Sequence, residues 1–174
     1  NVLDQDSPFL EIQPFAAYGT NNYNVGGGCV SGVGIISGIE CVIFANDPTV
    51  LAGAMHFYSV KKWMRCMQIA RDCRIPFIQF VESAGGDLRP RAGASVGGVG
   101  HFAESGRQFY EITELSKLNI PTVTVAFGTA TAGGAYQPGM SDYNIFVKNQ
   151  ADVALAGPPL VQMATGEISS REDI

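Results

Sequence analysis

The sequence predicts an α/β fold. Two apolar runs of strand length, at 76–81 and 121–127, alternate with two segments of helical periodicity, one beginning at Ser59 and one at 104–118. Strands that alternate with helices favour right-handed crossover connections. A glycine-rich segment directly follows each apolar run, and in open α/β sheets ligands bind beyond the carboxyl ends of the strands.

Composition excludes several classes of function. The 174 residues are 46% hydrophobic and carry a formal charge of −5, which suits one domain with an apolar core. The sequence has no basic stripe that would indicate a nucleic-acid partner, and no apolar run of the roughly 18 residues that a membrane span requires. The four cysteines include no CxxC pair, which argues against a zinc site. We therefore expect a reducing compartment: the cytoplasm, or the mitochondrial matrix in a eukaryote.

The chain divides into a lead-in segment and one domain. Residues 1–25 are irregular and contain two prolines, which predicts a lead-in with one short helix. Residues 26–174 make up the expected domain. The opening residues do not resemble a signal peptide, Asn1 is not a methionine, and the last residues include no capping glycine. We expect the sequence to be a piece of a longer protein.

A β-hairpin is expected at the start of the domain. Two β-branched runs at 30–36 and 40–45 flank the dipeptide Ser37–Gly38. A small polar dipeptide followed by glycine between two such runs is typical of a tight hairpin turn. A third short strand is expected after Pro48.

The first helix is expected to begin at Ser59, as its N-cap, and to end before Pro76. Its inward face should hold Val60, Trp63, Met64, Met67, Ala70 and Cys73. Its solvent face should hold Lys61, Lys62, Arg65, Gln68 and Asp72. Cys66 and Cys73 are expected to be core thiols, and Phe57 and Trp63 could also serve a subunit interface.

The second half alternates strands with helices. Residues 76–81 predict a buried strand, followed by a long loop at 82–100 and a helix at 104–118. Phe109, Ile112 and Leu115 should face inward from that helix. The run "PTVTVAF" predicts another buried strand, "GTATAGGAYQP" a loop and helix start, and "YNIFV" and "DVALAG" two more strands.

Both glycine-rich segments expose backbone N–H groups. Unpaired N–H groups at a helix start suit an anion, either a phosphate or the oxyanion that forms when a thioester becomes an enolate. We expect 82–100 and 128–134 to face one another, with Gly133 and Gly134 bare so that a carbonyl oxygen can reach their amides. Tight packing of a helix against a strand or a second subunit would also explain the small residues.

Other signals for catalysis or nucleotide binding are weak. Neither glycine-rich segment matches a Walker A or GxGxxG pattern, and the glycines at 26–28 precede their strands, as a flexible strand entry would. His56 and His101 are the two histidines, and no GxSxG elbow or metal-ligand cluster is present. We therefore expect no metal site. A reaction that depends on backbone amides needs few reactive side chains.

Five separated motifs carry a resemblance to a known family. They are "ANDPTV", "AGAMHFYSVKKWMR", "VESAGGDLR", "LSKLNIPTVTVAFGTATAGGAYQPGMSD" and "AGPPLVQMATGE". Together they resemble the carboxyltransferase (β) subunit of biotin-dependent acyl-CoA carboxylases, in the crotonase-like superfamily. The "GPPLVxxATGE" run is similar to the 3-methylcrotonyl-CoA branch, and a propionyl- or acetyl-CoA enzyme is also compatible. The "SAGGDL" turn departs from the SGGA pattern usual in the family, which leaves the acyl group open.

The resemblance implies a fold, a reaction and partners. It implies the N-terminal lobe of a superhelix of ββα turns, with a second lobe following Ile174, so the piece alone is expected to be inactive. It also implies transfer of CO2 from carboxybiotin on a carrier protein to an acyl-CoA. The implied partners are a biotin carboxylase and biotin carrier (α) subunit and further copies of the β subunit, as a dimer or hexamer.

The resemblance also implies site residues. Gly85 and Gly86 would donate hydrogen bonds to the thioester oxygen, with Ala84 beside them, and Gly133 or Gly134 would supply the partner amide. The remaining candidates would contact coenzyme A or line a channel: Arg89, Arg91, Ala132, Tyr136 and Pro138. Tyr136 could equally be core packing, and Pro158 and Pro159 are expected to shape a loop between lobes.

Three alternatives remain open. A crotonase-type hydratase or isomerase would usually need a glutamate near the helix after the second glycine turn, where this chain has Tyr136 and Gln137. A biotin-dependent acyl-CoA decarboxylase would share the same fold. A non-catalytic assembly subunit would lack affinity for coenzyme A.

Overall fold

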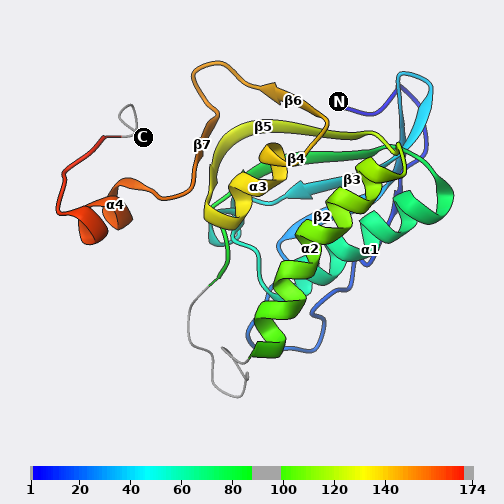
Figure 1. The fold of residues 1–174 in the computed structure, drawn as a ribbon. Helices are drawn as coiled ribbons and strands as arrows, with labels where there is room; N and C mark the ends of the chain where they lie inside the picture. The colour runs from blue at the N-terminus through cyan, green and yellow to red at the C-terminus, as the bar shows by residue number, and fades with distance from the viewer. Residues whose placement is uncertain (1, 88–98, 171–174) are drawn as a thin grey trace.

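The computed structural model describes residues 2–87 and 99–170 (Figure 1). The elements, in chain order, are β1 (Leu10–Glu11), β2 (Cys29–Ile36), β3 (Ile39–Asn46), the 3-10 helix η1 (Leu51–Gly53), α1 (Phe57–Cys73), β4 (Phe77–Ser83), α2 (Val99–Lys117), β5 (Thr122–Thr131), the 3-10 helix η2 (Ala132–Ala135), α3 (Tyr136–Gly139), β6 (Tyr143–Phe146), β7 (Asp152–Ala154) and α4 (Pro158–Thr165). The expected alternation of strands and helices is confirmed.

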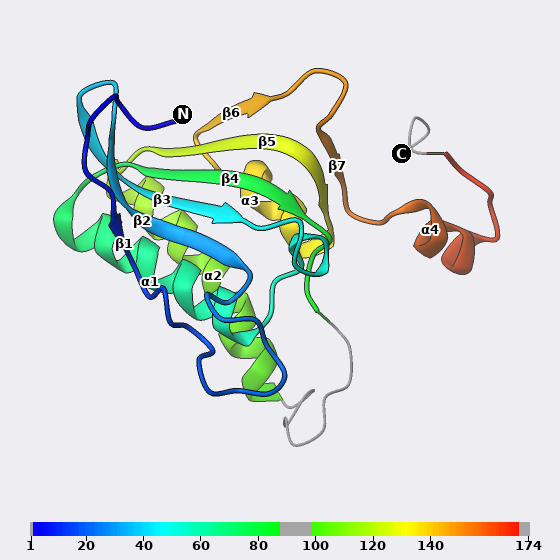
Figure 2. The same cartoon turned by 180° about the vertical axis from the view of Figure 1, so that it is seen from behind.

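One seven-stranded sheet organises the molecule. Its strand order is β1-β2-β3-β4-β5-β6, and β7 pairs with the last part of β5. β1, β2 and β3 are antiparallel neighbours, whereas β3, β4, β5 and β6 pair in parallel. Helices α1, α2 and α3 lie on one face of this sheet, and the opposite face is turned to the viewer in Figure 2. The carboxyl ends of β4 and β5 therefore lie side by side.

The expected hairpin is confirmed, and the lead-in differs from expectation. Ser37 and Gly38 both have positive φ, at 53° and 75°, as a two-residue turn between twisted strands requires. The carboxylate of Asp4 accepts hydrogen bonds from both N–H groups, each at 2.7 Å. The prediction of a short helix in the lead-in is wrong, because the described residues 2–25 contain the strand β1 and turns.

The N-cap of α1 lies three residues earlier than expected. His56 is the N-cap, and its Nδ1 accepts the N–H of Tyr58 at 3.2 Å. Ser59 lies in the first turn, where its Oγ accepts the N–H of His56 at 2.6 Å. The helix ends at Cys73 because Arg74 adopts a left-handed conformation, with φ of 55°. Ser59 therefore closes the cap from inside the helix.

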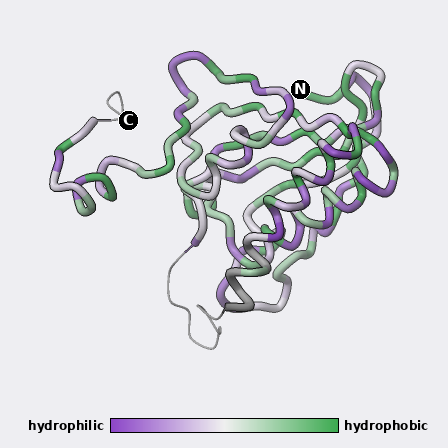
Figure 3. The backbone as a smooth tube through the Cα atoms, in the orientation of Figure 1, coloured by the Kyte–Doolittle hydropathy of each residue, from purple (hydrophilic) through white to green (hydrophobic). Residues whose placement is uncertain are grey.

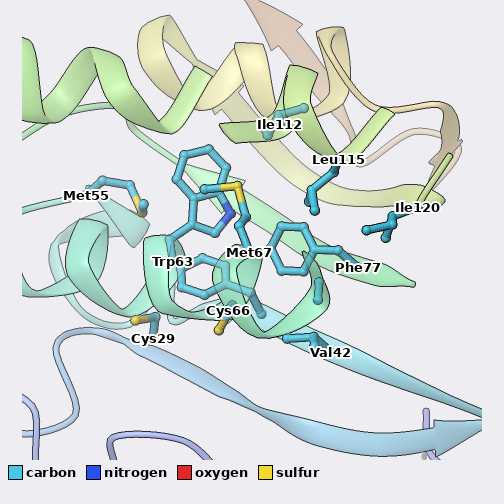
Figure 4. Packing of buried hydrophobic residues seen from close by; sticks show 12 residues of the cluster. Cys29, Val42, Met55, Trp63, Cys66, Met67, Phe77, Ile112, Leu115 and Ile120 are labelled. Carbon is cyan, nitrogen blue, oxygen red and sulfur yellow. The ribbon is translucent and has the colours of Figure 1, made fainter. Parts of the chain in front are cut away.

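The core lies between α1, α2 and the sheet (Figure 4). Its centre is formed by Phe44, Trp63, Met67, Phe77, Ile112 and Leu115, each fully buried. Hydrophobic and hydrophilic residues alternate along α1 and α2, as one-sided packing requires (Figure 3). The carboxylate of Glu111 on α2 also accepts a hydrogen bond from Arg71 on α1, at 2.7 Å. Because Trp63 is fully buried, its suggested part in an interface is wrong.

Two expectations for the faces of α1 are wrong. Cys73 is exposed, because it lies in the last turn beyond the packed face. Lys62 is fully buried, although it was expected in solvent. Its ammonium donates to the carbonyl oxygens of Gly26 at 2.9 Å and Cys29 at 2.8 Å. The glycine turn at 26–28 and the first residue of β2 therefore each supply one of the acceptors that a buried ammonium needs.

Three further boundaries differ from expectation. The segment after Pro48 forms η1 instead of a strand, and a Cβ on Gly53 there would collide with the carbonyl oxygen of Glu82. β5 continues to Thr131, so residues 128–131 of the glycine-rich segment 128–134 belong to the strand. Pro158 and Pro159 open α4 instead of shaping a loop, since proline fits the first helical turn.

The described residues hold neither a membrane helix nor a metal cluster. Within residues 2–87 and 99–170, no helix has the length and apolar character needed to cross a bilayer. In the same part of the chain, no group of three or more His, Cys, Asp and Glu side chains is placed to hold a metal ion.

Candidate functional site

The two glycine turns that follow β4 and β5 are in contact. A Cβ on Gly85 would lie 2.9 Å from the carbonyl oxygen of Thr131 and 3.2 Å from the Cβ of Ala132. The same position is 3.7 Å from the amide nitrogen of Gly133. β4 and β5 are parallel neighbours, so their carboxyl ends deliver both turns to the same edge of the sheet.

Most polar backbone groups of the first turn already have partners. Ala84 donates its N–H to the carbonyl of Ala52 at 3.0 Å. Met55 pairs with the turn in both directions, because its N–H donates to Gly85 O at 2.7 Å and its carbonyl accepts from Asp87 N at 2.8 Å. The N–H of Gly85 donates to Oγ of Ser83 at 3.2 Å. Among the described residues, the N–H of Gly86 is the one in this turn without an acceptor.

The direction of the Gly86 amide follows from these bonds. In a trans peptide the carbonyl of one residue and the N–H of the next point in opposite directions. The carbonyl of Gly85 points at Met55, so the N–H of Gly86 points away from Met55. Among the described residues it has no hydrogen-bond acceptor. Of the two amides expected to act as donors in this turn, that of Gly85 is bonded to Ser83, and that of Gly86 is available to a ligand.

The second turn begins at the end of β5. Ala132 takes a left-handed conformation, with φ of 52°, and starts η2. Gly133 and Gly134 are the second and third residues of that helix. In a 3-10 helix the N–H of the third residue donates to the carbonyl three positions back, here that of Thr131. The N–H of Gly133 has no such partner, and it has no other acceptor within the described chain. Because α3 is only four residues long, its helix dipole adds little, and the amides themselves matter here.

The four glycines fall into two pairs. Gly85 and Gly134 are required by packing: Gly85 has φ of 91° and abuts Thr131, and a Cβ on Gly134 would lie 3.0 Å from the Cβ of Ser83. In contrast, a Cβ on Gly86 or Gly133 would meet no described atom within 4 Å. Packing within the described chain therefore accounts for Gly85 and Gly134 but not for Gly86 and Gly133.

The other expected contact residues are spread around the turns. Ala84 is exposed and Ala132 half-buried. Tyr136 is 45% exposed, and its ring lies 4.8 Å from that of Phe109 between centroids. Pro138 is buried. Arg89 and Arg91 lie outside the described residues.

Sequence reasoning missed a buried polar network behind the second turn. Oε1 of Gln79 on β4 accepts from the indole of Trp63 at 2.7 Å, and its amide donates to Oγ1 of Thr124 at 3.3 Å. Thr124 and Ser141 share a hydrogen bond of 2.6 Å, and Ser141 donates to the carbonyl of Gln137 at 2.8 Å. The available signal was the polar residue at 79 within the alternating buried face of β4.

The perturbed titratable groups in the described chain serve structure. Burial raises the pKa of Cys29 to about 12 and that of Cys66 to about 11, so both stay protonated thiols. Asp142 follows α3. Partial burial acts to raise the pKa of its carboxyl, but hydrogen bonds from Thr122 and Ser116 outweigh burial and hold it below the usual value. This carboxylate ties the end of α3 to the beginning of β5.

The protein is therefore an α/β protein whose parallel strands β4 and β5 carry two adjacent glycine turns at their carboxyl ends. Residues 1–174 match the family model described as "Carboxyl transferase domain". The solved β subunit of geranyl-CoA carboxylase from P. aeruginosa is 38% identical and superposes with a TM-score of 0.83, covering 98% of this chain and 30% of its own. The expected crotonase-like α/β fold is thereby confirmed.

Curated relatives agree with the family model. A probable biotin-dependent acyl-coenzyme A carboxylase beta2 subunit of Mycobacterium tuberculosis is 46% identical over 99% of this chain and 31% of its own length. A probable mitochondrial methylcrotonoyl-CoA carboxylase beta chain of Drosophila melanogaster is 45% identical over 99% of this chain and 30% of its own. The chain belongs to the carboxyl transferase domain family. It spans about a third of the length of these relatives.

Proposed function

We propose that this chain forms part of the carboxyltransferase component of a biotin-dependent acyl-CoA carboxylase. Its substrate would be a branched or long-chain acyl-CoA similar to 3-methylcrotonyl-CoA. The observation that carries the proposal is the contact between two glycine turns in which the amides of Gly86 and Gly133 lack acceptors among the described residues. The names of its relatives, acyl-CoA, methylcrotonoyl-CoA and geranyl-CoA carboxylases, support the substrate class.

The amides would act on the thioester carbonyl. When a base takes the proton from the α-carbon of the acyl-CoA, or from its γ-carbon if the chain is unsaturated, negative charge develops on the thioester oxygen. Two converging N–H groups that need not reorient stabilise that charge, which is usually the largest single contribution to such catalysis. Gly86 would donate from the first turn, and Gly133 from the second, where the packed Gly134 is the less accessible of the two expected donors. Because Gly86 and Gly133 carry no side chains, the oxygen can approach both amides.

Biotin fits this arrangement as a group carried by a partner protein, and when bound it supplies the activated carboxyl group. The residues of this chain would bind the acyl-CoA and hold its enolate while the new carbon–carbon bond forms. We keep Ala84, Ala132 and Tyr136 as residues that border the thioester. Arg89 and Arg91 follow the first turn in the sequence, and we propose them as partners of the coenzyme A phosphates.

We further propose assembly with a biotin-carrying α subunit and with copies of the β subunit, as a dimer or hexamer. Large apolar side chains are exposed on β6, β7 and α4: Tyr143, Ile145, Phe146, Val153, Leu160 and Met163. Large apolar side chains exposed in this number on neighbouring segments of the chain favour an interaction surface. Sedimentation of the full-length protein tests this part, and a monomer at micromolar concentration would contradict it. The proposed compartment is the cytoplasm, or the mitochondrial matrix in a eukaryote.

The central test removes one amide hydrogen from the site. In the full-length protein with its biotin-carrying partner, Gly86→Pro deletes the N–H, whereas Gly86→Ala keeps it and adds a Cβ that meets no described atom. We expect Gly86→Pro to lower kcat for carboxylation of 3-methylcrotonyl-CoA about 10²–10³-fold, as loss of an oxyanion donor does. Gly86→Ala should lose far less.

Two further measurements guard this test. Circular dichroism and the melting temperature show whether the proline variant is folded. Calorimetric titration with acetyl-CoA and 3-methylcrotonyl-CoA distinguishes an enzyme from an assembly subunit. A full-length protein that binds neither thioester, or a folded Gly86→Pro variant with normal kcat, would refute the proposal.

A further inference from the structure

Ser83 contacts both glycine turns. It is the last residue of β4 and is fully buried. Its Oγ accepts the N–H of Gly85 at 3.2 Å in the first turn. In the second turn, the site of a Cβ on Gly134 lies 3.0 Å from Cβ, 3.1 Å from Oγ and 3.2 Å from the carbonyl oxygen of Ser83. One small side chain therefore lies between the two turns.

The hydrogen bond from Gly85 limits how the first turn can rotate. Glycine reaches φ of both signs easily, so a glycine pair can flip its central peptide unless other groups hold it. Gly85 is held on two sides, since its N–H bonds to Ser83 and its carbonyl accepts from Met55 at 2.7 Å. These two bonds select the conformation with φ of 91°. They also fix the peptide that carries the N–H of Gly86.

We infer that Ser83 is a positioning residue for the amide pair, an inference that rests on the proposed function. Its hydroxyl holds the Ala84–Gly85 peptide and so limits the rotation at Gly85 that would turn the Gly85–Gly86 peptide away from Met55. The backbone and Cβ of Ser83 set how closely Gly134 approaches. Ser83 contacts no reacting atom in this role. It acts through Gly86, whose N–H points outward only while the carbonyl of Gly85 remains on Met55.

A simple packing role for Ser83 makes a different prediction. Ser83→Ala keeps the Cβ that contacts Gly134 and removes only the oxygen that accepts from Gly85. If Ser83 only fills space, this variant loses a little stability and keeps its turnover. If it orients the peptide, turnover falls with little change in substrate affinity, because the amide is needed most when charge develops on the oxygen.

Ser31 offers a matched control. It is also a fully buried serine in a strand, on β2, and its Oγ donates to the carbonyl of Ile12 at 3.0 Å. Ser31→Ala therefore removes the same atom from a similar environment remote from the two turns. In the full-length protein with its biotin-carrying partner, we expect Ser83→Ala to lower kcat for 3-methylcrotonyl-CoA roughly tenfold, with KM changed less than about twofold. Ser31→Ala should keep kcat within about twofold.

Restoring an acceptor gives a second readout. Ser83→Cys places a sulfur where the oxygen was, and sulfur is a weak acceptor. Its kcat should therefore lie between those of Ser83→Ala and the unchanged protein. Hydrogen–deuterium exchange of the segment 84–87 should be faster in Ser83→Ala than in Ser31→Ala, because the Gly85 amide loses its partner.

The outcomes separate the inference from the proposed function. If the unchanged protein carboxylates the thioester and Ser83→Ala keeps its kcat, the inference fails and the proposed function stands. If the unchanged protein has no transferase activity, the proposed function fails. In that case hydrogen exchange decides alone: faster exchange at 84–87 supports an orienting hydroxyl, and unchanged exchange overturns it.

Discussion

At the scale of single residues, glycine occurs in the two turns for two different physical reasons. Gly85 has φ of 91° and abuts the carbonyl of Thr131, and Gly134 lies against Ser83. Gly86 and Gly133 have neither positive φ nor a described neighbour where a Cβ would project. Sequence alone gave all four the same role, because a glycine letter does not show its φ or its neighbours.

This division predicts opposite outcomes for alanine substitutions. Gly85→Ala would force a Cβ into a left-handed conformation and against Thr131, which should lower the free energy of unfolding by about 2–4 kcal/mol. Gly134→Ala should lose about 1–3 kcal/mol by crowding Ser83. Gly86→Ala and Gly133→Ala should stay within about 1 kcal/mol of the unchanged protein.

Thermal unfolding of the four variants of the full-length protein measures this order. The melting temperatures of Gly85→Ala and Gly134→Ala should fall well below those of Gly86→Ala and Gly133→Ala. Equal melting temperatures for all four would show that the assignment of two roles is incorrect.

At the scale of elements, Asp142 joins α3 to β5. Its carboxylate accepts the N–H and hydroxyl of Thr122 at 2.8 and 2.9 Å and the hydroxyl of Ser116 at 2.8 Å. Ser116 belongs to α2, so one side chain connects the end of α2, the start of β5 and the segment after α3. The second glycine turn lies between β5 and α3, and this carboxylate helps to hold both of its flanks.

The lowered pKa of Asp142 predicts a pH dependence. A carboxyl whose pKa is lower in the folded state stabilises that state above its ordinary pKa of 3.8, and the contribution disappears as pH falls through the lowered value. Asp142→Asn should therefore lower the melting temperature at pH 7. The difference from the unchanged protein should shrink as the pH falls below about 4.

Melting curves of both full-length proteins between pH 3 and pH 7 provide the measurement. Other carboxyls protonate in the same range, so the quantity to follow is the difference between the two proteins at each pH. A difference that grows towards pH 3 would contradict the assignment of a stabilising, ionised Asp142.

Element types followed from pattern more reliably than element ends did. The hairpin at Ser37–Gly38 and the strand β4 lie where turn chemistry and apolar runs predict them. The start of α1 differed because His56 caps the helix, and histidine is not among the usual N-cap residues. Lys62 was misplaced because the acceptors that bury its ammonium come from residues more than 30 positions away. Such contacts leave no local signature.

The site was predictable to a similar degree. Two glycine-rich segments after consecutive parallel strands predict adjacent turns, and the contact of Gly85 with Ala132 agrees. The hydrogen bond from Gly85 to Ser83 could not be predicted from the sequence, because a serine side chain at the end of a strand can adopt several orientations. The roles of Arg89 and Arg91 remain predictions from the family resemblance.

At the scale of the whole molecule, the long strand β5 links the sheet to the outlying segments. Its first part pairs with β6 at 123–126, and its last part pairs with β7 at 129–131. Beyond β7, the chain runs to α4, which stands apart from the sheet and its helices (Figure 1). No described residue of α4 is buried.

The pairing of β7 with Thr129, Ala130 and Thr131 has a mechanical consequence. Ala132 comes next, so the pairing of β7 with β5 ends directly before the second turn. A subunit that displaced α4 or β7 would also displace the end of β5, which lies two residues before Gly133. If the proposed subunits dock on α4 or β7, their contacts and the position of the Gly133 amide would therefore be coupled through the end of β5.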